Sequence, residues 1–286
     1  MSIVVTGATG ALGRLVIDEL LAQIPASTVA AVVRSKEKAA DLAARGVEIR
    51  IADYSEPATL VGAFRPGDRV LLISGSEVGQ RVPQHTAVID AAKAAGVAQL
   101  AYTGVLGGPD ADFLLADDHK VTEQLILDSG LPYTFLRNGW YTENYTAQLG
   151  VVLEHGAVVT NAGEGRVASA ARADFAAGAA AVLLGDIGTH LGRTYELSGD
   201  VAWSFSEYAA EVAKASGKAV SYTGVPAAEH QKILVGAGLP EGFAAILVDV
   251  DEAIARGRLA GTSGDLARLI GRPTTPLAVS VAAALA

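Results

Sequence analysis

The sequence predicts an α/β fold in which a doubly wound parallel sheet is joined to a smaller α+β part. Three observations carry this prediction. Short β-branched strands alternate with helical segments over the first half, a glycine-rich loop follows the first strand, and the alternation stops after Arg137. Strands separated by helices form a parallel sheet that is covered on both faces. We therefore expect a Rossmann-type dinucleotide-binding domain over residues 1–137 and a smaller substrate-binding part over residues 138–286.

Six strands are expected in the first half, because short runs of strand-forming residues recur at regular spacing. They are Ile3–Thr6, Thr28–Val33, Val47–Ala52, Val70–Ile73, Gln99–Thr103 and Tyr133–Leu136. Helices are expected between them, where apolar residues recur at helical spacing or a proline opens the segment. They are Ala11–Gln23, Lys36–Arg45, Pro57–Phe64, Val82–Ala95 and Ala116–Ser129.

The second part lacks this alternation. Asn138–Asn144 is polar and aromatic, and Gly156–Gly165 is interrupted by glycines. Beyond them we expect an alanine-rich helix that begins near Asp174 and strands at Thr194–Leu197 and Val220–Thr223. No Pro/Ser-rich linker separates the two parts, so we expect them to pack together with the ligand site in the cleft between them.

The composition excludes several classes of protein. Half of the 286 residues are hydrophobic and 19% are charged, which is not the composition of a disordered chain. The chain has no cysteine, which removes disulfide scaffolds and thiolate metal sites and fits a cytoplasmic protein. A net charge of −9 without a basic stripe argues against nucleic-acid binding. We expect no membrane span, because no apolar run reaches about 18 residues. We also expect no signal peptide, because no basic region precedes the first apolar stretch and that stretch contains glycines.

The loop Thr6–Gly13 (TGATGALG) follows the first expected strand and opens the first expected helix. Gly7 allows a tight turn, Gly10 lets backbone N–H groups approach a pyrophosphate, and Gly13 lets the helix pack against the strand. The alternative is a glycine-rich turn without a ligand, but this context favours a dinucleotide at the helix N-terminus. The expected cofactor contacts from this loop are Gly7, Ala8, Thr9, Gly10, Ala11, Leu12 and Gly13.

The ends of the next strands carry further candidates. Arg34 ends the second strand, where an acidic residue would bind the ribose 2′-hydroxyl of NAD. Its guanidinium suits a 2′-phosphate and predicts NADPH in preference to NADH, the alternative being a solvated surface arginine. Asp53 either accepts a hydrogen bond from the adenine or caps the following segment, and the sequence favours neither. Ser74, Gly75 and Ser76 end the fourth strand and leave room for the cofactor.

Several of these segments resemble the NmrA-like branch of the atypical short-chain dehydrogenases/reductases, and within it the bacterial NAD(P)H:quinone oxidoreductases. They are the glycine loop, Arg34, Ser74–Arg81 (SGSEVGQR), Arg137–Tyr145 (RNGWYTENY), Arg172–Asp174 and Gly271–Thr275. The resemblance implies an NADPH-dependent reductase that transfers a hydride to quinones or similar flat electron-poor acceptors. It implies no flavin and no metal.

The superfamily's Tyr-x-x-x-Lys pair is missing from the helix after the fifth strand. If Glu123 takes the place of a glutamate found four residues past that lysine, His119 replaces the lysine and Leu115 replaces the tyrosine. Thr103, counted among the cofactor contacts, and Gly104 stand where the superfamily serine is expected. Ordinary alcohol–ketone chemistry is therefore disfavoured. A quinone is already an electrophile and mainly needs to be oriented.

The catalytic candidates donate hydrogen bonds to the developing oxyanion: Asn138, Tyr141 and His119. The substrate-binding candidates are Gln80, Asn138, Gly139, Trp140, Tyr141, Asn144 and Arg172. The alternatives without a functional role are packing for Trp140 and Tyr141, a helix cap for Asn138 and a solvated position for His119. A second function also fits the resemblance: a non-catalytic redox sensor that binds NADP(H) and acts through a protein partner. The sequence does not decide whether the chain forms a homodimer.

Overall fold

The computed structural model describes residues 2–286, and the chain forms two compact units. Unit 1 comprises Met1–Gly108, Asp118–Asn138 and Ala173–Glu196. Unit 2 comprises Pro109–Asp117, Gly139–Arg172 and Leu197–Ala286. The sequence placed a single division after residue 137, whereas the chain passes between the units several times. One reason is that residues 173–196 return to complete unit 1.

Unit 1 is built on a seven-stranded sheet with the strand order β3-β2-β1-β4-β5-β6-β9. The strands are β1 Ile3–Thr6, β2 Val29–Val33, β3 Glu48–Ile51, β4 Arg69–Leu72, β5 Gln99–Val105, β6 Tyr133–Asn138 and β9 Arg193–Leu197. Every pair from β3 to β6 is parallel. The six strands expected in the first half are confirmed. Because β2 and β4 flank β1, the order reverses at β1, as the doubly wound Rossmann-type fold requires.

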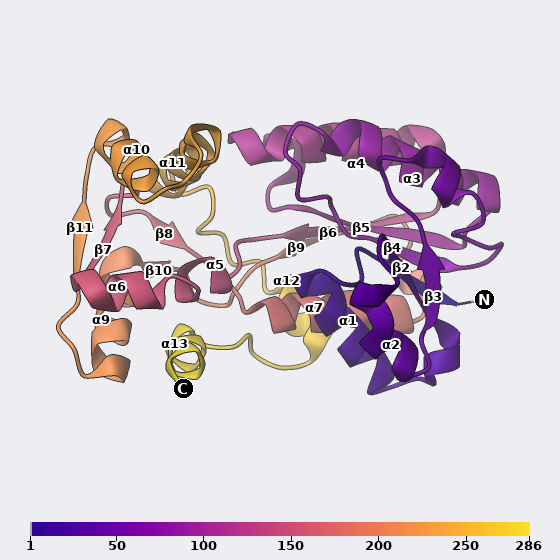
Figure 1. Cartoon of the computed structure of the whole chain (residues 1–286), viewed down its shortest axis with the longest axis horizontal. Coiled ribbons are helices and arrows are strands. Elements are labelled where there is room, and N and C mark those ends of the chain that lie inside the picture. The colour runs from indigo at the N-terminus through magenta and orange to yellow at the C-terminus, as the bar shows by residue number, and fades with distance from the viewer. Residues whose placement is uncertain (1) are drawn as a thin grey trace. The chain divides into compact units, whose positions relative to one another are not determined.

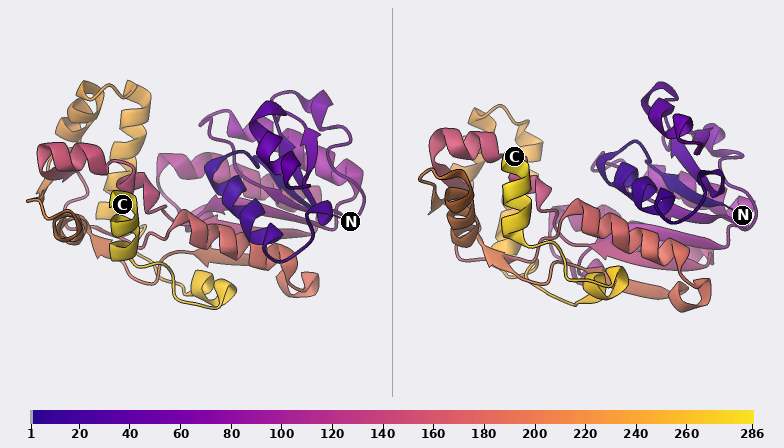
Figure 2. Two further views of the ribbon diagram at one scale, coloured as in Figure 1. Left: turned by 60° about the horizontal axis from the view of Figure 1, so that its bottom comes forward. Right: turned by 90° about the horizontal axis from the view of Figure 1, so that it is seen from below.

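Helices cover both faces of this sheet (Figure 1). One face carries α3 Arg81–Ala95 and α4 Leu114–Ser129, and the other carries α1 Ala11–Leu21, α2 Ala40–Ala44 and α7 Arg172–Leu184. The short helix α8 Ile187–His190 follows α7. In both views of Figure 2, α7 lies along the sheet of unit 1. Arg69 explains this attachment, because its buried guanidinium donates to the last carbonyls of α7, with Nη2 2.8 Å from the Val182 oxygen.

Two expected helices are shorter in the structure. Pro57–Phe64 contains only the 3₁₀ helix η3 Pro57–Leu60, since Gly62 turns the chain with a φ of +83°. Lys36–Arg45 divides into the 3₁₀ helix η2 Glu37–Ala39 and α2. The predicted length was wrong for Pro57–Phe64, because the apolar spacing of so short a segment does not distinguish one turn from two. The second segment is helical over residues 37–44, within one residue of the prediction at each end. The remaining 3₁₀ turns are η1 Ala26–Thr28 and η4 Gly108–Asp110.

The face of the sheet under α3 and α4 forms a hydrophobic core. Side chains alternate along a strand, so every second residue of β1, β2, β4 and β5 faces these two helices. The core residues include Val4, Val32, Val70, Leu72, Leu100, Tyr102, Val88, Ile89 and Ile126. Tyr102 is fully buried and brings a hydroxyl group into this apolar layer, where burial requires a hydrogen-bond partner.

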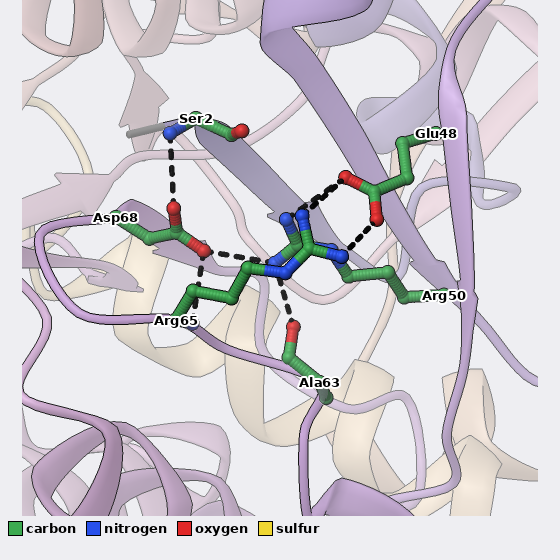
Figure 3. Close-up of polar contacts among 6 residues, drawn as sticks. All are labelled: Ser2, Glu48, Arg50, Ala63, Arg65 and Asp68. Atoms are coloured by element: carbon green, nitrogen blue, oxygen red, sulfur yellow. Dashed lines mark hydrogen bonds and ion pairs between the residues drawn. The ribbon is translucent and has the colours of Figure 1, made fainter.

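A buried ion pair fastens the end of the sheet where β1 and β4 begin (Figure 3). Asp68 accepts from Arg50 Nη1 at 2.8 Å, from the Arg65 backbone N–H at 3.0 Å and from the Ser2 backbone N–H at 2.9 Å. The Arg50 and Asp68 side chains are only 6% and 1% exposed. Breaking such a pair by removing one partner costs about 3–5 kcal/mol, because the other charge stays buried. The pair therefore ties β1 and β3 to the turn before β4.

Unit 2 is α+β, as expected. β7 Ala157–Thr160 pairs in parallel with β11 Ser221–Gly224, and β8 Arg166–Val167 pairs antiparallel with β10 Trp203–Ser204. The helices are α5 Glu143–Thr146, α6 Leu149–His155, α9 Phe205–Ser216, α10 Ala227–Gly236, α11 Glu241–Ala255, α12 Asp265–Ile270 and α13 Leu277–Leu285. Rings from α5, β10 and α9 pack edge to face in its core, with the Tyr145 and Trp203 centroids 5.1 Å apart.

Along residues 2–286, no helix combines the length and the apolar character needed to cross a membrane.

Candidate functional site

The loop between β1 and α1 carries the glycine motif. Gly7 has a φ of +59°, and its carbonyl accepts from the Gly10 N–H at 2.9 Å. Gly10 is the N-cap of α1, and the first bond back to it comes from the Arg14 N–H at 3.0 Å. The N–H groups of residues 11–13 therefore have no partner within the helix. Free N–H groups and the positive end of a helix dipole are the features that bind anions in proteins, so this helix start is a candidate anion site.

Gly13 is required by packing rather than by its backbone angles. A Cβ at this position would lie 2.4 Å from the Gly7 carbonyl oxygen and 2.7 Å from the Ala8 Cα. A Cβ at Gly10 would lie 3.1 Å from the same oxygen. Ala8 and Leu12 are buried, so only their backbone can meet a ligand. The predicted residues of this loop thus lie together around the start of α1, and the glycines leave the backbone open to a pyrophosphate.

Two threonines fix the strand ends beside this loop. Thr6 Oγ1 donates to the Leu71 carbonyl at 3.0 Å and accepts from the Ile73 N–H at 3.1 Å. Thr103 Oγ1 accepts from the Ser74 N–H at 2.9 Å. Thr103 is buried, so the structure places it behind Ser74, where its hydroxyl sets the course of the chain leaving β4. Thr6 was not singled out by the sequence, because its role depends on a neighbouring strand.

The residues at the ends of β2 and β3 are accessible. The Arg34 side chain is 68% exposed, and its Nη1 lies 3.8 Å from Glu77 Oε1. Asp53 Oδ1 accepts from the Ser55 N–H at 2.9 Å. This bond closes a local turn at Asp53 and does not cap a helix, because the N-cap of η3 is Glu56 and no side chain caps it, so the capping alternative is wrong. A contact between Asp53 and adenine stays a prediction.

The loop after β4 is held from behind by α3. Gly75 donates its N–H to His85 Nε2 at 2.9 Å, and its carbonyl accepts from Arg81 Nε at 2.6 Å. A Cβ on Gly75 would lie 2.9 Å from Gln84 Oε1, so a larger residue there would displace the end of the Gln84 side chain. Ser76 and Gln80 are exposed on the outer side of the loop. Arg81, which the sequence did not single out, is buried and supports the loop from α3.

His119 lies in a buried polar cluster of unit 1. Its Nδ1 is 2.7 Å from the Tyr102 hydroxyl, while His85 Nδ1 is 2.9 Å from Thr122 Oγ1. Since His85 Nε2 accepts from the Gly75 N–H, His85 carries its proton on Nδ1 and donates it to Thr122. His119 is only 8% exposed, so the solvated alternative is wrong.

Both rings of this cluster are neutral at pH 7. Burial, reinforced by the nearby Arg81 charge, lowers the pKa of His85 to about 4 and the pKa of His119 to about 3. Burial also raises the pKa of the Tyr102 hydroxyl, which stays protonated. A neutral imidazole next to a protonated phenol offers hydrogen-bond donors without a charge.

Asn138 is the last residue of β6 and is 6% exposed. Its carbonyl accepts from the Leu106 N–H at 3.0 Å, which holds it against the end of β5. The N-cap of the following helix α5 is Thr142, so the capping alternative for Asn138 is wrong. Its neighbour Arg137 forms a bidentate pair with Glu123, at 2.9 and 2.7 Å. This pair fixes the end of β6 from the α4 side.

The remaining candidates belong to unit 2. Gly139 donates its N–H to the Leu197 carbonyl at 2.7 Å, and a Cβ there would lie 2.9 Å from the same oxygen. The Arg172 guanidinium carbon lies 4.9 Å from the centroid of the Tyr141 ring. Glu143 accepts from the Arg172 N–H at 2.9 and 3.0 Å, so it holds the start of α7. Tyr141 and Arg172 are thus brought together, while Trp140 is half-buried and Asn144 is exposed.

Among residues 2–286, no three histidine, aspartate or glutamate side chains gather as a metal site would need.

The sequence of the chain matches a known family over the region that contains this site. The profile of the NAD(P)H-binding family covers residues 7–185, which is more than half of the chain. The chain belongs to the NAD(P)H-binding family. Gly7, Gly10 and Gly13 at the start of α1 are called the glycine cradle below. The cradle fits the pyrophosphate of such a cofactor, because a Cβ at Gly13 or Gly10 would crowd the loop.

This NAD(P)H-binding chain is similar to characterised reductases over its whole length. It is 50% identical to quinone oxidoreductase 2 of Escherichia coli K12 over 279 residues, 98% of this chain and 97% of the relative. The crystal structure of an NADPH-dependent quinone oxidoreductase from E. coli complexed with NADPH matches with a TM-score of 0.95 and 48% identity, covering 99% and 100% of the two chains. Citrobacter sp. triphenylmethane reductase complexed with NADP(H) gives 0.94 and 42%, again covering 99% and 100%. The resemblance to bacterial quinone oxidoreductases is confirmed.

Proposed function

We propose that this protein is an NADPH-dependent reductase of quinones or similar flat electron-poor acceptors. The observation that carries the proposal is the match over the whole chain to a quinone oxidoreductase whose structure holds NADPH. The glycine cradle supports it from this chain's own residues. The similarity to a Citrobacter sp. triphenylmethane reductase, which is linked to bioremediation of triphenylmethane dyes, supports a wider class of electron-poor acceptors. The absence of cysteine fits a reducing compartment, and we propose a cytoplasmic location.

The residues of unit 1 bind and orient the cofactor in this proposal. The N–H groups at the start of α1 bind the pyrophosphate, and Arg34 binds the 2′-phosphate. Bound NADPH supplies a hydride, and so two electrons, to the acceptor. Ser74 and Gly75 shape the floor of the site, since their backbone is fixed by Thr103 and His85.

The acceptor needs orientation and uncharged donors more than a strong acid. Trp140 flanks the flat ring, and Asn138, Tyr141 and His119 donate hydrogen bonds toward the oxygen that gains negative charge. His119 suits this role because its low pKa keeps the imidazole neutral at pH 7. A neutral ring avoids a permanent buried charge and still presents an N–H.

The direct test is oxidation of NADPH by benzoquinone and menadione, followed by the loss of NADPH absorbance, with NADH run in parallel. We expect saturable turnover that prefers NADPH. Binding of NADP(H) without turnover on either acceptor would contradict the enzyme. That result would support the alternative, a redox sensor that acts through a protein partner.

Replacing Arg34 with alanine is expected to weaken NADPH binding by about 1–3 kcal/mol, roughly 5- to 150-fold, because a charge-assisted contact to the phosphate is lost. NADH binding should change little. Calorimetric titration of both cofactors measures the difference. Lys93→Ala is the matched control, because Lys93 is an exposed cation on α3. Equal losses for both cofactors would remove Arg34 from the phosphate site.

Replacing Trp140 with alanine is expected to raise the KM for quinone roughly 2- to 10-fold, the worth of one aromatic stacking contact, and to spare NADPH binding. Steady-state kinetics and a melting curve separate this role from packing. Trp203→Ala is the matched control, because Trp203 is 4% exposed and donates to Ser169 in the core of unit 2. It should lower the melting temperature instead. A Trp140 variant that melts early with unchanged kinetics would show that Trp140 serves packing.

A further inference from the structure

A carboxylate faces the proposed phosphate site. Glu77 lies in the SGSEVGQR loop after β4, and its Oε1 is 3.8 Å from Nη1 of Arg34 at the end of β2. The two side chains are 53% and 68% exposed, so both are accessible to a ligand. The separation is longer than a hydrogen bond, and an exposed ion pair of this kind contributes little to stability. The pair is therefore weak enough for a ligand to replace.

The position of Glu77 is fixed by the fold. Its other oxygen, Oε2, accepts from Gln84 Nε2 at 3.0 Å, and the same amide nitrogen donates to Ser55 Oγ at 3.0 Å. Gln84 is 8% exposed and belongs to the first turn of α3, which gives it a defined position. The Glu77 carbonyl also accepts from the Gln80 N–H at 3.0 Å. Oε2 of Glu77 is thus held by Gln84 of α3, and Oε1 faces Arg34.

The two forms of the cofactor place opposite demands on this carboxylate. A 2′-phosphate carries close to two negative charges, so it attracts Arg34 and is repelled by Glu77. A ribose 2′-hydroxyl carries no charge and can donate to a carboxylate, which is the role of the acidic residue in NAD-binding sites. In this chain the guanidinium comes from β2 and the carboxylate comes from the loop after β4. The chain therefore offers a cation that suits the 2′-phosphate of NADPH and a carboxylate that suits the 2′-hydroxyl of NADH.

We propose that Glu77 is a specificity-determining residue that opposes Arg34: it competes with the 2′-phosphate for Arg34 and accepts from the 2′-hydroxyl of NADH. The inference rests on the proposed function in one respect, namely that Arg34 binds the 2′-phosphate. Glu77 thereby reduces the difference in affinity between NADPH and NADH, so that the protein can still bind NADH. Its loss should make the protein more selective for NADPH.

Glu77→Gln tests this inference, because glutamine keeps the size of the side chain and an oxygen for Gln84 while removing the charge. Calorimetry with NADP⁺, NAD⁺, adenosine 2′,5′-bisphosphate and 5′-AMP measures affinity without any acceptor. We expect the two 2′-phosphorylated ligands to bind roughly 2- to 5-fold more tightly. We expect NAD⁺ and 5′-AMP to bind about 2-fold more weakly, since one hydrogen-bond acceptor is made neutral.

Two controls give the result its meaning. Asp90→Asn changes the net charge equally from an exposed position on α3 and should leave all four affinities unchanged. In an Arg34→Ala background, Glu77→Gln should tighten the 2′-phosphorylated ligands less than it does in the wild type, because the competition for Arg34 is gone and only the direct repulsion by Glu77 remains to be relieved. Equal changes in affinity for all four ligands would overturn the inference. They would show that Glu77 only holds the loop after β4 in place. An effect of Asp90→Asn as large as that of Glu77→Gln would overturn it in favour of long-range charge.

The same measurements separate this inference from the proposed function. A shift in ligand preference without quinone turnover supports the role of Glu77 and contradicts only the reductase. Turnover with an unshifted preference contradicts only the role of Glu77. If 2′-phosphorylated ligands bind the wild type no better than their unphosphorylated counterparts and are unaffected by Arg34→Ala, the phosphate site and the inference both fail.

Discussion

The wild-type protein is expected to lose about 3 kcal/mol more stability between about pH 7 and pH 4 than a His119→Asn variant. The pKa of His119 lies near 3 in the folded chain, against an ordinary value of 6.5. Between these values the unfolded chain binds the proton and the folded chain does not. The stabilisation is therefore complete above about pH 6.5 and is lost as the pH falls toward 3. Asparagine keeps an acceptor for the Tyr102 hydroxyl but does not titrate.

Urea unfolding at a series of pH values measures this difference. His155→Asn is the matched control, because His155 is exposed on α6, and it should follow the wild type. Asp251 must be present in every variant compared, because it also titrates in this range: burial raises the pKa of its carboxyl to about 7. Its contribution has the opposite sign and is lost as the pH rises from about 4 to 7. Parallel pH curves for the wild type and the His119 variant would show that His119 is protonated in the fold.

Replacing Gly13 with alanine is expected to weaken NADPH binding roughly 100-fold and to lower the stability of unit 1. The added Cβ would meet backbone atoms of Gly7 and Ala8, which have no rotamer by which to move aside. Helix α1 must shift, and the N–H groups at its start shift with it. Calorimetry of NADPH and thermal melting measure the two effects.

Gly150→Ala is the control for the Gly13 variant. Gly150 lies in α6, and a Cβ there meets nothing within 4 Å. It should leave NADPH binding unchanged and raise stability slightly, because alanine is the better helix former. Undiminished affinity in the Gly13 variant would mean that the loop tolerates a shifted helix, and the cradle would then not explain cofactor binding.

Much of unit 1 was predictable from local patterns. The strands β1 to β6 are short, β-rich and regularly spaced, and the turn at Gly7 requires a residue that accepts positive φ. The segment Thr194–Leu197 was also expected as a strand, and it forms part of β9. Its place beside β6 was not predictable, because pairing between distant segments leaves no local signal. The length of η3 was missed, and so was the division of residues 37–44 into η2 and α2, because few residues define the period of such short segments.

The candidate site divides in the same way. Gly13 and Arg34 were predicted because their position after a strand carries the chemistry. Arg81 and Tyr102 were not, because nothing in the order of residues shows that a charged or hydroxyl side chain will be buried beside His85 and His119. For Asp53 the sequence left two roles open, and the structure excludes the capping role, because Asp53 bonds to Ser55 in a local turn and Glu56 is the N-cap of η3.

The late arrival of β9 has a consequence for synthesis of the chain. Until residue 197 has left the ribosome, β6 is the outermost strand of the sheet and presents unpaired N–H and C=O groups. A nascent or truncated chain that ends near residue 138 therefore carries an open edge that invites pairing with other chains. A minimal cofactor-binding module would have to keep residues 173–197 and replace 139–172 with a flexible linker. In the natural chain, unit 1 cannot be completed until residues 139–172 of unit 2, which are inserted into its sequence, have been synthesised.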